Sequence, residues 1–194
     1  MKKIFCAFFI FTAINISAQN KITKIKLVPA LTSDIEKVAR DYYIHFDNIK
    51  GEKLSESGNI IEYASKISPP GAIESTIMQI KSLQNSYSWQ ALMLNTENYD
   101  EAVAGYKKIY RQLNGAKISL EDGESYKLSG EYDTPSVSRA FASSMLELNA
   151  NKKAMQSFKI EIALNYSMPE WSVKIYVYEK ENDADIRPTV NTGY

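Results

Sequence analysis

Residues 158–178 carry the clearest pattern in the chain, with apolar side chains at every second position on both sides of a short loop. A period of two is typical of strands that bury one face, and the loop between the two runs predicts a hairpin. We expect Tyr166 to lie opposite Trp171, and Ile162 opposite Ile175. A shift of one residue would turn the whole apolar set toward solvent, so the pattern fixes this register.

Two other stretches place apolar residues three and four positions apart, which is the period of a helix with one buried face. The first is 34–50, where Ser33 and Glu36 have the spacing of a capping box. The second begins after Asn98, a favourable N-cap residue, and ends at Gly115. We therefore predict two amphipathic helices.

The rest of the chain reads mainly as short strands between turn residues. We predict strands over 60–67, 73–80, 87–94 and 126–132. The run 87–94 is almost wholly apolar, so we expect it to lie centrally in a sheet. The polar stretch 51–58 has a glycine at each end and is predicted to be a loop.

Two segments have patterns that fit both a helix and a strand. In 73–80 the isoleucines have helical spacing, but the crowding of β-branched residues and the loop that follows favour a strand. In 134–148 a Thr-Pro pair suits a helix start, whereas 141–148 can pair with the hairpin that follows. We favour the strand in both segments.

The order of elements is helix, strands, helix, strands, without the strand–helix alternation that parallel crossovers require. This order predicts an α+β fold, in which a mostly antiparallel β-sheet has two main helices packed on one face as a two-layer sandwich. A length of 194 residues suits a single domain. We assign the domain to 19–180 and expect the polar segment 181–194 to be a flexible tail.

Residues 1–18 have the three parts of a secretory signal peptide: Lys2 and Lys3, an apolar run, and small residues ending at Ala18. The segment resembles the leaders of exported bacterial proteins. Its apolar run is shorter than the roughly 20 residues of a membrane span. We therefore expect cleavage, no stable membrane anchor afterwards, and a periplasmic or extracellular location. Cleavage also removes Cys6, the single cysteine.

Composition excludes several kinds of chemistry. The chain has 23 basic and 23 acidic residues, so it has no net charge to attract nucleic acid. It has one histidine and one cysteine, which is too few for common zinc sites and for most pairs of nucleophile and base. We expect His45, at the edge of the first helical stripe, to be half-buried with a local hydrogen bond. No serine-hydrolase or nucleotide-binding motif occurs, so we predict no catalytic residue, no cofactor and no metal.

Tyrosine is abundant, with 13 residues. Tyr176 and Tyr178 fall on the hairpin face opposite the apolar set, where exposed rings would form a contact surface for a protein or glycan partner. A structural interpretation competes with this one, because tyrosine is a good strand residue and a helix over that face would bury both rings.

These observations favour an exported non-enzymatic binding protein of the bacterial cell envelope. One alternative is a carrier of a small apolar ligand, with Trp89 and Trp171 as walls of a cavity between sheet and helices. A second alternative is a carboxylate-dependent glycan hydrolase, because such an enzyme needs only two suitably spaced acidic residues.

Overall fold

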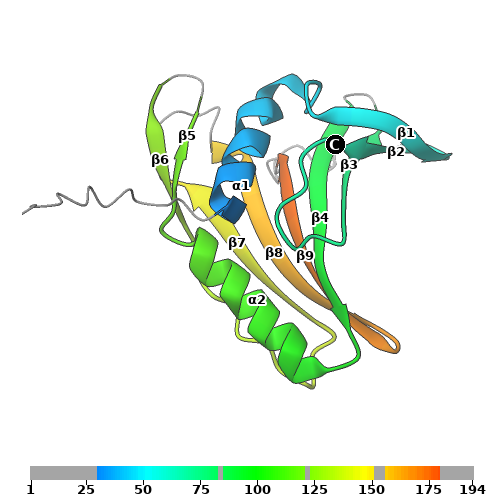
Figure 1. Ribbon diagram of the computed structural model, residues 1–194, viewed down its shortest axis with the longest axis vertical. Helices are drawn as coiled ribbons and strands as arrows, with labels where there is room; N and C mark the ends of the chain where they lie inside the picture. Colours follow the sequence, from blue (N-terminus) through cyan, green and yellow to red (C-terminus); the bar gives the residue numbers. More distant parts are fainter. Residues whose placement is uncertain (1–29, 83–84, 121–122, 151–155, 180–194) are drawn as a thin grey trace, which may run out of the picture.

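An antiparallel sheet forms the body of the molecule, and its helices lie on one face (Figure 1). The structure is a computed structural model that describes residues 30–82, 85–120, 123–150 and 156–179. Within these residues nine strands follow the order β1-β2-β3-β4-β9-β8-β7-β6-β5, and all neighbouring pairs are antiparallel. The predicted α+β fold is confirmed.

The elements have the following bounds. The helices are α1 (Ala30–Asp41), the short 3-10 helix η1 (Tyr42–Ile44) and α2 (Tyr99–Leu113). The strands are β1 (Lys50–Ser57), β2 (Ile60–Ser65), β3 (Glu74–Ile80), β4 (Ser86–Thr96), β5 (Lys117–Ser119), β6 (Ser125–Ser129), β7 (Phe141–Leu148), β8 (Phe158–Ser167) and β9 (Glu170–Glu179).

The predicted signal peptide, 1–18, and the predicted tail, 181–194, lie outside the described residues. In the part of the chain that is described, no helix has the length and apolar character needed to cross a membrane.

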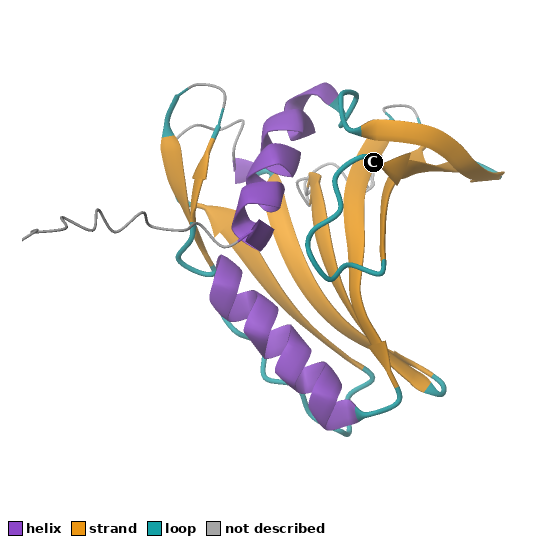
Figure 2. Ribbon diagram, in the orientation of Figure 1, coloured by secondary structure: helices purple, strands orange, loops and turns teal. Residues whose placement is uncertain are grey.

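The hydrophobic core lies between the two helices and the concave face of the sheet (Figure 2). Val173, Ile175 and Val177 of β9 are fully buried there. Tyr106 of α2 is also fully buried, and its hydroxyl lies 2.6 Å from Ser144 Oγ of β7. This hydrogen bond satisfies both polar groups inside the core.

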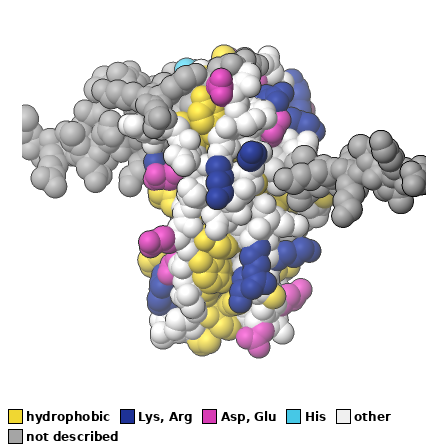
Figure 3. Space-filling view, turned by 90° about the vertical axis from the view of Figure 1, so that its left-hand side faces the viewer, with side chains coloured by type: hydrophobic (Ala, Val, Ile, Leu, Met, Phe, Trp, Pro, Cys, Tyr) yellow, Lys and Arg dark blue, Asp and Glu magenta, His cyan; other side chains and the backbone are white. Residues whose placement is uncertain are grey.

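Helix α2 begins and ends as its sequence predicts. The Asn98 side chain accepts a hydrogen bond from the Glu101 backbone N–H at 3.1 Å, and the helix stops before Gly115. Its solvent side carries Lys107, Lys108 and Arg111, which are exposed. Figure 3 shows Lys and Arg side chains gathered beside an apolar band on this flank of the molecule.

The β8–β9 hairpin has the predicted register, with Tyr166 opposite Trp171 and Ile162 opposite Ile175. Both ambiguous segments are strands: 73–80 contains β3 and 141–148 is β7. The helical alternative for 134–148 is therefore wrong.

The first helix differs from its prediction in both bounds. It begins at Ala30 and ends at Asp41, so Ser33 lies inside it and is not an N-cap. The Asp41 carboxylate accepts hydrogen bonds from the backbone N–H groups of Asn48 at 3.0 Å and Ile49 at 3.1 Å, which folds the chain back on itself. Phe46 is fully buried although it lies outside the helix. The spacing of the apolar residues therefore predicted its burial correctly but not its secondary structure.

The predicted loop at 51–58 is also wrong, because these residues belong to β1 at one edge of the sheet. Residues 52–57 of β1 are exposed, which explains their polar composition. Gly51 does not end a helix. A Cβ atom at this position would lie 2.9 Å from the backbone oxygen of Ala64 in β2, so glycine permits the two strands to approach closely.

Candidate functional site

The two predicted binding tyrosines lie on the outer face of the sheet, which is the face opposite the helices. Tyr176 and Tyr178 alternate along β9 with Ile175 and Val177, which are buried in the core. Side chains of a strand alternate between its two faces. The helices therefore leave both tyrosines uncovered, and the interpretation that a helix buries them is wrong.

Both rings line a cleft on this face, the outer-face cleft, with a volume of about 440 Å³. It extends over the upper parts of β3, β4, β9 and β8 as drawn in Figure 1. Its lining residues are Ile80, Ser86, Tyr87, Ser88, Glu161, Ala163, Asn165, Tyr176, Tyr178 and Glu179. Tyr87 and Glu179 border it near strand ends, and their side chains point to the helix face because they alternate with Ser88 and Tyr178.

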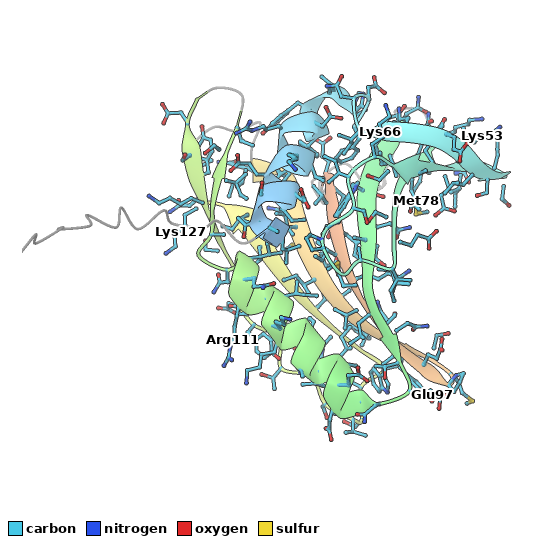
Figure 4. The ribbon with its side chains drawn as sticks, in the orientation of Figure 1. Lys53, Lys66, Met78, Glu97, Arg111 and Lys127 are labelled. Carbon is cyan, nitrogen blue, oxygen red and sulfur yellow. The ribbon has the colours of Figure 1, made fainter. Side chains whose placement is uncertain are left out.

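The cleft is hollow because small and large side chains alternate across neighbouring strands. Ser88 of β4 lies opposite Tyr178, and Ala163 of β8 lies diagonally across from Tyr176 on the same face. A serine or alanine beside a tyrosine ring leaves the space above it open to solvent. Met78 of β3, which pairs with Ser88, lies on the same side of the sheet (Figure 4).

Glu161 of β8 is the central polar group of the cleft. It lies opposite Tyr176, its Oε2 accepts a hydrogen bond of 2.9 Å from the Tyr178 hydroxyl, and its Oε1 accepts one from Ser143 Oγ. A carboxylate can accept about four hydrogen bonds, so about two positions stay available to a ligand.

The tyrosine hydroxyls stay neutral at physiological pH. Burial raises the pKa of Tyr178, and its hydrogen bond to Glu161 raises that pKa further, because ionisation would place two negative charges side by side. Burial also raises the pKa of Tyr176, with a second contribution from the charge of Glu161. Both hydroxyls therefore serve as hydrogen-bond donors.

The charge of the cleft is negative. Glu161 is its carboxylate, since Glu179 alternates with Tyr178 and directs its side chain to the helix face, and the lining includes no Lys or Arg. Two lysines lie near it on the outer face. Lys159, opposite Tyr178, is paired with Glu147 at 2.7 Å, and Lys174, opposite Ala163, lies two residues before Tyr176 on the same face of β9.

The two predicted tryptophans lie in the core, on the other side of the sheet. Trp89 is fully buried, and its indole N–H donates to Ser65 Oγ at 2.9 Å. The Trp171 ring packs between Tyr99 and Tyr166, with centroid distances of 5.0 and 4.8 Å. The structure thus brings Tyr176 and Tyr178 together and separates both from the tryptophans.

His45 is exposed and stacks on Tyr87 at a centroid distance of 4.7 Å, so the prediction of a half-buried histidine is wrong. Its backbone has φ 58°, in the left-handed region, because the chain reverses direction after η1.

Glu161 is the site residue that sequence reasoning missed. It reads as an ordinary outward-facing acid of a strand. The predicted hairpin register nevertheless places it opposite Tyr176, and this cross-strand pairing was the signal that could have identified it. Ser88 and Ile80 come from strands whose register the sequence leaves open.

Among the described residues, no group of three or more His, Cys, Asp or Glu side chains has an arrangement that could hold a metal ion. Comparison of the chain with protein families, with curated proteins and with solved structures gives no match.

Proposed function

We propose that this chain is an exported, non-enzymatic binding protein of the bacterial cell envelope, and that a partner binds in the outer-face cleft. The observation that carries the proposal is the pair of half-buried rings, Tyr176 and Tyr178, beside the hydrogen-bonded carboxylate of Glu161. Tyrosine suits such a surface because its ring is apolar and its hydroxyl polar. The predicted signal peptide supports the exported location.

The setting of these residues favours recognition. They stand on β8 and β9, which are inner strands of the sheet with a neighbour on each side. The Tyr178 ring is held by its bond to Glu161. Groups that are ordered before binding lose little side-chain entropy when a partner arrives, so more of the contact energy appears as affinity.

The proposal is tested by capture of partners from the envelope fraction with purified protein. The variant carries Tyr176→Ala with Tyr178→Ala, and the control variant Phe141→Ala removes an aromatic ring that is 60% exposed and does not line the cleft. We expect the double variant to lose most of the protein or glycan that the wild type recovers, and the control to keep it. Equal recovery by all three proteins would refute a role for the cleft.

A glycan hydrolase is the weaker candidate, because it needs two carboxylates in one cleft and the Glu179 side chain lies on the face opposite that of Glu161. Its test is release of reducing sugar from cell-wall and dietary glycans by the purified protein. Turnover that Glu161→Gln and Glu179→Gln both abolish would replace the binding proposal with an enzymatic one. The core positions of Trp89 and Trp171 give no support to an apolar carrier.

A further inference from the structure

We infer that the outer-face cleft selects a positively charged group, supplied by a lysine or arginine side chain of a partner protein. The inference rests on the proposed binding function and specifies the chemistry of the partner.

The charge of the cleft favours a cation. One carboxylate, that of Glu161, faces the cleft and no basic side chain lines it, so the lining is electrostatically unfavourable for an anionic partner. Glu161 receives hydrogen bonds from Tyr178 and Ser143, which hold its carboxylate in place without neutralising it. A guanidinium or ammonium group can occupy the remaining acceptor positions.

The tyrosine rings add an attraction that a neutral partner would not receive. A cation within about 6 Å of a ring centroid is attracted by the negative face of the ring. Tyr176 and Tyr178 flank Glu161, so a cation bound to that carboxylate lies beside both aromatic side chains. Their raised pKa values keep both rings neutral.

The chain already holds one of its own cations in this way. Lys50 Nζ lies 5.3 Å from the ring centroid of Tyr63 and 5.1 Å from that of Tyr87. It also contacts Asp47 Oδ1 at 2.6 Å. Lys50 thus lies against two tyrosine rings and one carboxylate, and Tyr176, Tyr178 and Glu161 present the same combination of groups in the outer-face cleft.

Among the described residues, neither neighbouring lysine forms an ion pair with Glu161. Lys159 is held by Glu147 and by the backbone oxygen of Gln156, both at 2.7 Å. Lys174 lies beside Ala163 at the border of the cleft. Its positive charge weakens the attraction of the cleft for a cation, so removal of this charge should strengthen cation binding.

The test measures binding of two small probes by calorimetry and by the amide NMR spectrum of the protein at low salt. Nα-acetylarginine methylamide carries the cation, and Nα-acetylcitrulline methylamide has nearly the same shape without charge. We expect the arginine probe to bind at least tenfold more tightly and to shift the amide signals of Ser88, Glu161 and Tyr176.

Three variants connect this preference to the cleft. Glu161→Gln keeps an oxygen that can accept from Tyr178 and removes the charge, so the arginine probe should lose about tenfold in affinity. Lys174→Gln should increase its affinity about twofold to threefold. The control Glu97→Gln removes an exposed carboxylate at the opposite end of β4 and should change affinity less than twofold (Figure 4).

The outcomes separate this inference from the function that it rests on. Equal affinity for both probes, no binding of the arginine probe, or an affinity that Glu161→Gln leaves unchanged would each overturn cation selection. Partner capture that still depends on Tyr176 and Tyr178 would then leave the binding function intact and assign a neutral partner. If the double tyrosine variant also captured normally, the cleft itself would be the wrong site.

Discussion

The Tyr178 hydroxyl donates a hydrogen bond of 2.9 Å to the Glu161 carboxylate across the β8–β9 hairpin. This bond crosses a diagonal of the ladder, because the residue directly opposite Glu161 is Tyr176. It therefore links the pair Lys159–Tyr178 to the pair Glu161–Tyr176, which is the next pair on the outer face. The Tyr176 hydroxyl, in contrast, has no hydrogen-bond partner among the described residues.

That difference predicts unequal effects of removing each hydroxyl. Tyr178→Phe should lower the free energy of unfolding by about 1 to 2 kcal/mol, because it removes a hydrogen bond to a charged group. Tyr176→Phe should change it by less than about 0.5 kcal/mol. Denaturant unfolding of both variants and the wild type measures the two values. A loss for Tyr178→Phe no larger than that for Tyr176→Phe would contradict a stabilising hydrogen bond between Tyr178 and Glu161.

Alkaline pH should destabilise the fold through its buried tyrosines. Burial raises the pKa of Tyr106 to about 12, although the hydrogen bond with Ser144 lowers it, and burial raises that of Tyr42 to about 12. Unfolded tyrosine ionises near its ordinary value of about 10. The stability that each neutral hydroxyl contributes is thus complete below pH 10 and is lost as pH rises toward 12.

The measurement is the free energy of unfolding between pH 8 and 12, together with the ultraviolet absorbance of tyrosinate. Tyr106→Phe cannot ionise, so its stability should fall less steeply with pH than that of the wild type. A fall of the same steepness in both proteins would assign the alkaline loss to other groups.

Glu56 of β1 forms two acid-sensitive ion pairs. Lys81 Nζ lies 2.7 Å from Glu56 Oε1 and Lys53 Nζ lies 2.9 Å from Oε2, and hydrogen bonds from these lysines lower the pKa of Glu56 to about 2. A lowered pKa stabilises the fold above the unfolded value, and this contribution is lost as pH falls toward 2. Because the carboxylate is exposed, salt should weaken the effect.

Carboxyl carbon NMR can follow Glu56 directly through its titration. Lys81→Ala should raise the pKa of Glu56 by about one unit or more, whereas Lys66→Ala, which removes an exposed lysine that does not contact Glu56, should leave it in place. A Glu56 that titrates at its ordinary value in the wild type would contradict the ion pair.

Gly130 should not tolerate a side chain. A Cβ atom there would lie 1.9 Å from the backbone oxygen of Met145 in β7, and a strand backbone cannot move aside as a flexible side chain can. We expect Gly130→Ala to cost more than about 2 kcal/mol in thermal or denaturant unfolding. Ser129→Ala at the adjacent exposed position is the control and should cost less than about 0.5 kcal/mol.

The sequence predicted the elements whose pattern reflects local structure. The β8–β9 register followed from strict alternation, and the start of α2 followed from the Asn98 cap. The end of α1 did not follow, because it depends on Asp41 accepting backbone hydrogen bonds from residues seven and eight positions further along the chain. Strand β1 was missed because an exposed edge strand has no buried face to impose alternation.

The candidate site was predicted in part for the same reason. Tyr176 and Tyr178 follow from alternation within one strand, and Glu161 follows from the hairpin register. The depth of the cleft depends on Ser88, which reaches β9 only through the pairing of β4 with that strand. Such a contact joins residues 90 positions apart, and no local pattern encodes it.

The exposed charges of β1 have a consequence for association between molecules. An unpaired strand edge is a template onto which a second chain can add its own strand. At this edge the charged side chains of Lys53 and Glu56 would have to be desolvated before a second chain could pair with β1. The same residues that obscured β1 in the sequence thus act against polymerisation of the folded protein at high local concentration.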